Sequence, residues 1–205
     1  MQVEIIGLTQ FQQGEGSSEA LLEYAGRVCY RSEAKGIPDK FLKARIREGH
    51  ESIIEHASAT FEISGISRAC SHQLVRHRIA SYSQESQRYV DMSAPEFVVP
   101  PSVARDPHAL AVWEAFMCSV AHTYRQLRDL GVRKEDARFV LPNATATRLI
   151  VTMNFRSLRH FFSVRCDRAA QWEIREVALE MLRQIHALAP STFDDLYTRF
   201  VDAQE

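Results

Sequence analysis

The sequence predicts an α+β fold in a single domain over residues 1–205, and three observations support this. The chain is 45% hydrophobic and 25% charged, which is typical of one globular domain with enough core to fold independently. Segments with helical periodicity outnumber those with strand periodicity, and strands do not alternate with helices as in a doubly wound sheet. No internal repeat or low-complexity segment interrupts the chain. We therefore expect a mixed or antiparallel sheet with packed helices.

Hydrophobic periodicity and capping residues locate the expected elements. Strands are expected at residues 3–8, 57–66 and 144–153, and residues 84–90 are expected to be extended. Helices are expected at residues 19–30, 40–48, 67–76, 107–130, 134–139, 155–165 and 168–187, with a last one from about residue 193. Ser18 and Asp167 are predicted N-caps, Gly49 and Gly131 are predicted helix stops, and Pro190 is a predicted helix breaker.

The longest expected helix, residues 107–130, carries a wide apolar stripe. Its apolar side chains recur at helical spacing and are Leu110, Trp113, Phe116, Met117, Val120, Tyr124 and Leu127. Because exposure of so much apolar surface to water is unfavourable, we expect the stripe to be buried against a partner.

Charge, cysteine spacing and hydropathy limit the class of protein. The formal net charge is -1, so no overall basic field would attract nucleic acid. The four cysteines form no CxxC pair, which argues against a zinc ribbon or a disulfide scaffold and favours four buried or semi-buried free thiols. Met1–Leu8 lacks the basic segment and long apolar run of a signal peptide, and no window is apolar enough to cross a bilayer. We expect a cytoplasmic protein without nucleic-acid or membrane partners.

The most informative stretch is Arg76–Tyr89, which reads RHRIASYSQESQRY. It contains three arginines, one histidine, three serines and two glutamines, with few apolar side chains. Arginine presents a planar fork of donors that matches phosphate and carboxylate, and hydroxyls and amides can complete an anion shell. The stretch therefore predicts a pocket for a small phosphorylated ligand. Neither GxGxxG nor GxxxxGK[ST] is present, so we do not expect that ligand on a glycine-rich loop.

Two other classes of function remain open on these observations. The same arginines, with Tyr82 and Tyr89, could form an RNA-binding patch, although the chain lacks a wider basic surface. A metal-dependent nucleotide hydrolase could be built on the two histidines and two glutamates of His50–His56. Their spacing matches neither HExxH nor HxxEH, so we expect no metal site there.

A third polar cluster follows the strand expected at residues 144–153. Arg156 and His160 are four residues apart and share one helical face. Arg165 lies nine residues beyond Arg156, so a straight helix would direct it elsewhere, either to a different ligand or into a frayed last turn. A structural alternative for Arg165, and for Arg138, is compensation of a helix dipole.

Together these segments resemble the flavin-dependent thymidylate synthase family. RHRIASYSQESQR contains all six fixed residues of the thirteen-residue signature RHRxxSxxxxSxR. The resemblance extends to GHESIIEH, to ARFVLP around Arg138, and to NFR with His160 and Arg165, over essentially the whole chain. It implies synthesis of thymidylate (dTMP) from deoxyuridylate (dUMP), with 5,10-methylenetetrahydrofolate as carbon donor and NADPH reducing a bound FAD. It also implies a homotetramer whose active sites draw on several subunits.

The resemblance assigns ligands to individual residues. The residues that it places against FAD are Ser52, Arg76, His77, Arg78, Gln84, Asn154, Phe155, Arg156 and His160, with Phe155 contributing its backbone rather than its ring. The residues that it places against dUMP are Gln73, Leu74, Val75, Arg76, Gln84, Glu85, Ser86, Gln87, Arg88, Arg138 and Arg165. Both ligands carry phosphate groups, which explains the number of arginines. Gln84 stands where other members carry an acid, and glutamine keeps the hydrogen bonding without the charge.

Arg165 is similar to the activating residue of the family. Its guanidinium would stabilise charge on the pyrimidine as the N3 proton leaves, which makes C5 a better nucleophile. The flavin would supply the hydride. No cysteine lies inside a matched ligand-binding block. Cys166 adjoins Arg165. We expect its side chain to be a neutral thiol rather than a catalytic nucleophile.

Overall fold

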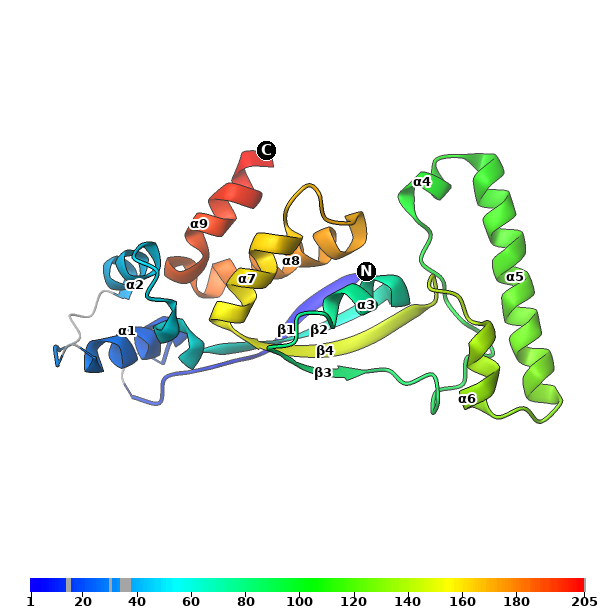
Figure 1. Ribbon diagram of the computed structural model, residues 1–205, viewed down its shortest axis with the longest axis horizontal. Coiled ribbons are helices and arrows are strands. Elements are labelled where there is room, and N and C mark those ends of the chain that lie inside the picture. The colour runs from blue at the N-terminus through cyan, green and yellow to red at the C-terminus, as the bar shows by residue number, and fades with distance from the viewer. Residues whose placement is uncertain (14–15, 30, 34–37, 205) are drawn as a thin grey trace. The chain divides into compact units, whose positions relative to one another are not determined.

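The computed structural model describes residues 1–13, 16–29, 31–33 and 38–204 and has an α+β fold (Figure 1). Four strands form one antiparallel sheet in the order β1-β2-β4-β3. The strands are β1 (Gln2–Leu8), β2 (Ser58–Ser67), β3 (Ser81–Gln84) and β4 (Ala146–Asn154). The predicted fold class is confirmed.

Helices make up most of the remaining described chain. The α-helices are α1 (Ser18–Val28), α2 (Pro38–Arg47), α3 (Arg68–Leu74), α4 (Pro101–Ala104), α5 (Pro107–Asp129), α6 (Lys134–Ala137), α7 (Phe155–Arg165), α8 (Trp172–Leu188) and α9 (Pro190–Phe200). The 3-10 helices are η1 (Glu51–His56), η2 (Arg138–Val140) and η3 (Asp202–Gln204). The predicted helix 155–165 is confirmed at both ends, whereas the predicted end of the first helix, residue 30, lies outside the described residues. Within the described ranges, no helix has the length and apolarity that a membrane span requires.

Two predicted N-caps were wrong because a neighbouring side chain takes the role. Ser17, not Ser18, caps α1, because the Ser17 hydroxyl oxygen accepts a hydrogen bond from the backbone amide of Ala20 at 3.0 Å. Helix α8 begins at Trp172 because the side-chain oxygen of Gln171 accepts hydrogen bonds from the backbone amides of Glu173 and Ile174, at 3.1 and 3.2 Å. Asp167, the predicted cap, instead accepts from an amide two residues on and closes a separate turn.

Two further boundaries differ from the prediction. Residues 85–90 are not extended, because the carbonyl of Ser86 accepts from the amides of Tyr89 and Val90 and closes a turn directly after β3. Pro190 ends α8 as predicted but also begins α9, in a first-turn position where its missing N–H costs nothing.

The chain divides into two compact units, which are described separately. The first comprises Met1–Ile63, Val75–Tyr82 and Ile150–Glu205, and the second comprises Ser64–Leu74 and Ser83–Leu149. Strands β2, β3 and β4 each continue from one unit into the other. A single domain over residues 1–205 stays a prediction.

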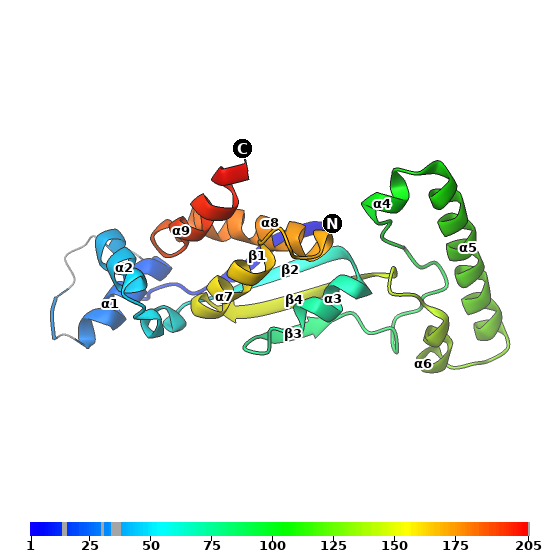
Figure 2. The ribbon, with the colours of Figure 1, turned by 45° about the horizontal axis from the view of Figure 1, so that its top comes forward.

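The core of the first unit is aromatic and surrounds α7. This helix contacts η1, α8 and α9 (Figure 2). Phe155 and Phe162 both meet Phe193 of α9 in edge-on contacts, with ring centroids 5.1 and 5.8 Å apart. All three rings are fully buried, and burial of a phenylalanine side chain contributes roughly 1.5–3 kcal/mol. This cluster therefore fixes the orientation of α7 on α9.

Strand β1 lies at one edge of the sheet, and α8 packs along it. The side-chain amide of Gln184 donates to the carbonyl of Val3 at 2.8 Å and accepts from the amide of Ile5 at 3.1 Å. One glutamine therefore occupies two backbone groups of the edge strand that no neighbouring strand would satisfy.

The second unit is built on α5. Its core joins Tyr124 of α5 to Met92 and Ala137, with the Met92 amide 3.3 Å from the Tyr124 hydroxyl. Met117, Val120 and Tyr124 of the predicted apolar stripe are buried. Phe116 is 58% exposed in this single chain, so burial of the whole stripe against a partner stays a prediction.

Candidate active site

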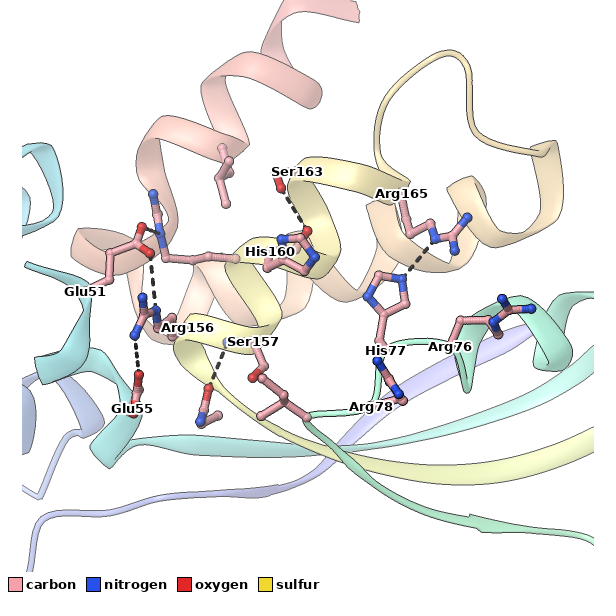
Figure 3. Close-up of a pocket in the computed structure, with 14 residues that line it drawn as sticks. Glu51, Glu55, Arg76, His77, Arg78, Arg156, Ser157, His160, Ser163 and Arg165 are labelled. Carbon is pink, nitrogen blue, oxygen red and sulfur yellow. Dashed lines mark hydrogen bonds and ion pairs between the residues drawn. The ribbon is translucent and has the colours of Figure 1, made fainter. Parts of the chain in front are cut away.

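A cavity of about 860 Å³ opens beside α7 in the first unit (Figure 3), within the roughly 300–1,000 Å³ of ligand pockets. It is lined by η1, by residues 76–79, by α7 with its cap, and by α9; the lining residues are Glu51, Glu55, Arg76, His77, Arg78, Ile79, Asn154, Arg156, Ser157, Arg159, His160, Ser163, Arg165 and Leu196. Seven of them were predicted ligand-binding residues: Arg76, His77, Arg78, Asn154, Arg156, His160 and Arg165. The structure therefore brings two separate motifs to one cavity.

The sequence of α7 explains its polar face toward the cavity. Phe155, Leu158 and Phe162 recur at helical spacing and are buried, so the intervening polar positions point away from the core. Asn154 begins this arrangement as the N-cap, with its side-chain oxygen accepting from the amide of Ser157 at 2.8 Å. Asn154 thus lines the cavity while it fixes the start of the helix that carries the other residues.

The cavity is strongly cationic, with five arginines against two glutamates among its lining residues. The two glutamates come from η1 and meet α7. Arg156 lies 2.6 Å from Glu55 and 3.7 Å from Glu51, measured between side-chain nitrogen and oxygen. These exposed pairs contribute little stability, so an anionic ligand can replace them at Arg156.

Arg159 lines the cavity but was not predicted from the sequence. It is 8% exposed and makes a two-pronged contact with the carboxylate of Asp195 on α9, with both N–O distances 2.7 Å. It also donates to the carbonyl of Thr192. Burial alone would raise the pKa of Asp195, but the hydrogen bonds and charge of Arg159 hold that pKa below its usual value. Arg159 therefore ties α7 to α9 at the cavity wall.

Arg165 reaches the same cavity as Arg156 and His160, so the prediction that it points elsewhere was wrong. It is the last residue of α7, and its long side chain extends to His77 (Figure 3). Its Nε donates to His77 Nε2 at 3.0 Å. Burial, together with the nearby charges of Arg165 and His160, lowers the pKa of His77 to about 4. His77 is therefore neutral near pH 7 and can accept this hydrogen bond.

The remaining donors fit a dinucleotide with a pyrophosphate, such as FAD. Arg76 and Arg78 are exposed, and neither has an acidic partner within the described ranges. Among the described residues, the hydrogen bond made by the Arg165 side chain is the one from its Nε to His77, which engages neither terminal nitrogen. Guanidinium groups without carboxylate partners on a concave surface are suited to phosphate oxygens. The donor set and the size of the cavity therefore agree with the expected cofactor.

The predicted dUMP residues Gln73, Leu74, Gln84–Arg88 and Arg138 belong to the second unit. There, Gln84 donates to the hydroxyls of Ser71 and Thr147 at 2.9 and 3.2 Å. Arg88 pairs with Glu135 at 2.7 Å, and Arg138 donates to the carbonyl of the same glutamate. Glu85 engages β4 through its amide, and Gln87 lies in the turn after Ser86.

Arg68 is a second residue that sequence reasoning missed. It opens α3, is about half-buried, and donates to the carbonyl of Glu85 at 3.4 Å. Burial, and then the positive charge of Arg138, lowers the pKa of its guanidinium. Two arginines that repel each other in the same unit form a favourable place for an anion. The sequence signal that could have drawn attention to Arg68 is its nearness to the polar stretch, which begins eight residues later at Arg76.

Four predicted contacts are restricted by burial or position. Phe155 and Leu74 are fully buried, and the backbone amide of Phe155 donates to the carbonyl of Ala57 at 2.9 Å. A backbone contact of Phe155 with the flavin stays a prediction. Ser52 lies on η1 but does not line the cavity. Val75, which directly precedes Arg76 in the sequence, is 36% exposed and does not line the cavity either.

The expectation of four buried or semi-buried thiols was wrong for Cys29 and Cys118, which are exposed, whereas Cys70 and Cys166 are buried. Cys166 follows Arg165 but lies in the core. Burial raises the pKa of its thiol to about 12, so the thiol is neutral at pH 7 and a poor nucleophile. We expect Cys166→Ser to retain turnover within about tenfold of the parent chain. A folded, inactive serine variant would reopen a nucleophilic role for this residue.

Comparison with known proteins identifies the family. A family model described as thymidylate synthase complementing protein matches residues 13–191. A flavin-dependent thymidylate synthase from Geobacter sulfurreducens is 53% identical over 188 residues, covering 86% of this chain and 81% of that protein. One from Mycolicibacterium gilvum is 39% identical over 234 aligned residues, covering 100% and 94%. In the ranges that the structure describes, no group of three or more histidine, cysteine or acidic side chains is arranged to hold a metal. The matches favour the flavoenzyme over RNA binding and metal-dependent hydrolysis, and the chain belongs to the flavin-dependent thymidylate synthase family.

Proposed function

We propose that this chain catalyses the reductive methylation of dUMP to dTMP, with 5,10-methylenetetrahydrofolate as carbon donor and NADPH as reductant of bound FAD. The observation that carries the proposal is the gathering of Arg76, Arg78 and Arg165, from two separate motifs, around one cavity. Family membership supplies the reaction, and the cavity supplies cationic groups that the reaction's anionic ligands need.

The cavity residues would hold the flavin dinucleotide mainly by charge. Arg76 and Arg78 would bind its phosphates, and Arg156 would exchange its exposed glutamate partners for the ligand. His160 and Asn154 face the same cavity and would add hydrogen bonds. Ser52 and Gln84 remain proposed contacts. The bound flavin supplies the hydride chemistry of the reaction.

Arg165 is the proposed activating residue. Its terminal nitrogens would lie beside the pyrimidine edge and stabilise the negative charge that develops when N3 loses its proton. This interaction strengthens as the charge grows, so it lowers the barrier rather than only the dissociation constant of dUMP. No cysteine nucleophile is needed, in agreement with the neutral buried thiol of Cys166.

The second unit would contribute the dUMP phosphate site. Arg88 and Arg138 were expected there, and Arg68 joins them because its charge and that of Arg138 already repel. A phosphate dianion between these arginines would relieve the repulsion and form charge-assisted hydrogen bonds. We also propose a cytoplasmic homotetramer with active sites shared between subunits, for which the 58% exposed Phe116 of α5 offers apolar surface.

The proposed function is tested by a flavin spectrum followed by a turnover assay. Purified protein should be yellow, release FAD on denaturation, and form dTMP from dUMP only when NADPH and methylenetetrahydrofolate are present. A colourless protein that also fails to take up added FAD would refute the proposal. RNA affinity with a steep salt dependence, or activity lost to chelators, would favour the other two classes.

The Arg78→Ala variant tests the cofactor site separately from turnover. It should lose flavin during dialysis that leaves the parent saturated, because one uncommitted guanidinium at the phosphates is removed. Arg105→Ala, on an exposed residue outside the cavity, is the matched control. Equal FAD stoichiometry in both variants after dialysis would contradict the assigned contact.

A further inference from the structure

We propose that His77 is a positioning residue for Arg165, because its ring accepts the Arg165 Nε–H and so directs both terminal guanidinium nitrogens into the cavity. This inference rests on the proposed activating role of Arg165. It gives the His77 side chain a role distinct from the flavin contact that the sequence motif implies.

The contact between the two side chains is specific. Arg165 Nε lies 3.0 Å from His77 Nε2, within the range of an N–H to nitrogen hydrogen bond. A guanidinium has one Nε–H and four terminal N–H donors arranged in a plane. A bond at Nε–H therefore restricts the orientation of the guanidinium and engages neither terminal nitrogen, and both of these lie on the side away from the imidazole (Figure 3).

His77 is itself held on two sides. Its ring meets the ring of Phe161 edge-on, with centroids 4.9 Å apart and an interplanar angle of 86°. Phe161 is fully buried in the core of the first unit. The hydroxyl of Tyr82 donates to the backbone carbonyl of His77 at 2.8 Å. The imidazole is thus a fixed acceptor, as a positioning residue must be.

The protonation state of His77 agrees with this role. Its pKa of about 4 follows first from burial and then from the charges of Arg165 and His160. The ring is therefore neutral at pH 7, and since Nε2 accepts, its proton resides on Nδ1. The groups whose charges act on the ring are Arg165 from α7 and His160, whose ring centroid lies 6.0 Å from that of His77. Both disfavour an imidazolium, which could not accept the hydrogen bond of Arg165.

Two substitutions separate positioning from packing. His77→Phe keeps a ring against Phe161 but has no acceptor, whereas His77→Gln offers an amide oxygen near the position of Nε2. With saturating FAD, His77→Phe should lower kcat for dTMP formation about 100-fold, the loss expected when a reacting group is misplaced by about 1 Å. His77→Gln should recover to within about tenfold of the parent chain. FAD stoichiometry and NADPH bleaching of the flavin without dUMP are measured in both variants because His77 also lines the cavity proposed for FAD, and kcat is compared at equal FAD occupancy.

A double-mutant comparison tests whether His77 acts through Arg165. Lysine at position 165 carries its three donors on one ammonium nitrogen, so a bond to His77 cannot orient two separate terminal nitrogens toward a ligand. In the Arg165→Lys background, His77→Phe should therefore change kcat by less than about threefold. Equal losses in the Phe and Gln variants, full activity of His77→Phe, or loss of FAD from it at saturating cofactor would each overturn the inference. Failure of the parent chain to form dTMP would instead overturn the proposed function.

Discussion

Replacing Arg165 by alanine is expected to reduce dTMP formation by about 10²–10³-fold while FAD stays bound, because a donor aimed at developing charge is lost. The fold should survive, since the described contact of this side chain is a single hydrogen bond to His77 at the end of α7. The lost interaction with the helix dipole amounts to roughly 0.3–1 kcal/mol. The measurements are steady-state dTMP formation, FAD stoichiometry and circular dichroism.

Arg168→Ala is the matched control for this change. Arg168 is exposed three residues further on and does not line the cavity, so turnover should stay within about threefold of the parent chain. If Arg165→Ala and Arg168→Ala were equally active, helix-dipole compensation would be the better account of Arg165, and the activating role would be refuted.

Asp195→Ala is expected to cause the largest loss of stability, about 2–4 kcal/mol of unfolding free energy. The substitution leaves the charge of Arg159 buried at the wall of the cavity without its two-pronged partner. The expected value lies toward the low side of roughly 3–5 kcal/mol for fully buried pairs because the Asp195 side chain is 58% exposed. Urea titration followed by circular dichroism measures it.

The expected loss of stability in Asp195→Ala comes from the buried charge of Arg159, and two further variants separate this cause from other effects of the substitution. Asp39→Ala removes an exposed carboxylate that pairs with Lys43 at 2.9 Å and should cost less than about 1 kcal/mol. Combining Asp195→Ala with Arg159→Met also removes the buried guanidinium and should regain part of the lost unfolding free energy. A double variant less stable than Asp195→Ala alone would show that packing of Arg159, rather than its charge, holds α7 to α9.

The sequence predicted which residues would gather better than it predicted the directions of their side chains. Arg76, Arg78 and Arg156 were proposed as ligand contacts because arginine suits phosphate groups, and all three line one cavity with His77. The direction of Arg165 was not predictable from helical periodicity. Periodicity gives the direction of a Cα–Cβ bond, whereas the contact of the long Arg165 side chain with His77 depends on where another segment of the chain lies.

Arg159 and the start of α8 were missed for different reasons. Arg159 pairs with Asp195 across 36 residues, and no local pattern marks that partner. At α8, both Asp167 and Gln171 can accept from backbone amides, and aspartate is the commoner cap. The structure selects Gln171 because Asp167 is already used in a turn of its own. Such competition between two nearby caps is settled by tertiary packing rather than by propensity.

The glutamine of α8 that bonds to β1 bears on the solubility of the protein. An uncovered edge strand can recruit a strand of another molecule, and this is a common first step in aggregation. Gln184 blocks that route with one side chain, because it already satisfies the outward groups of Val3 and Ile5. The consequence is that α8 protects the edge of the sheet from non-native association between molecules, and loosening this helix would expose that edge as well as disturb α7, against which it packs.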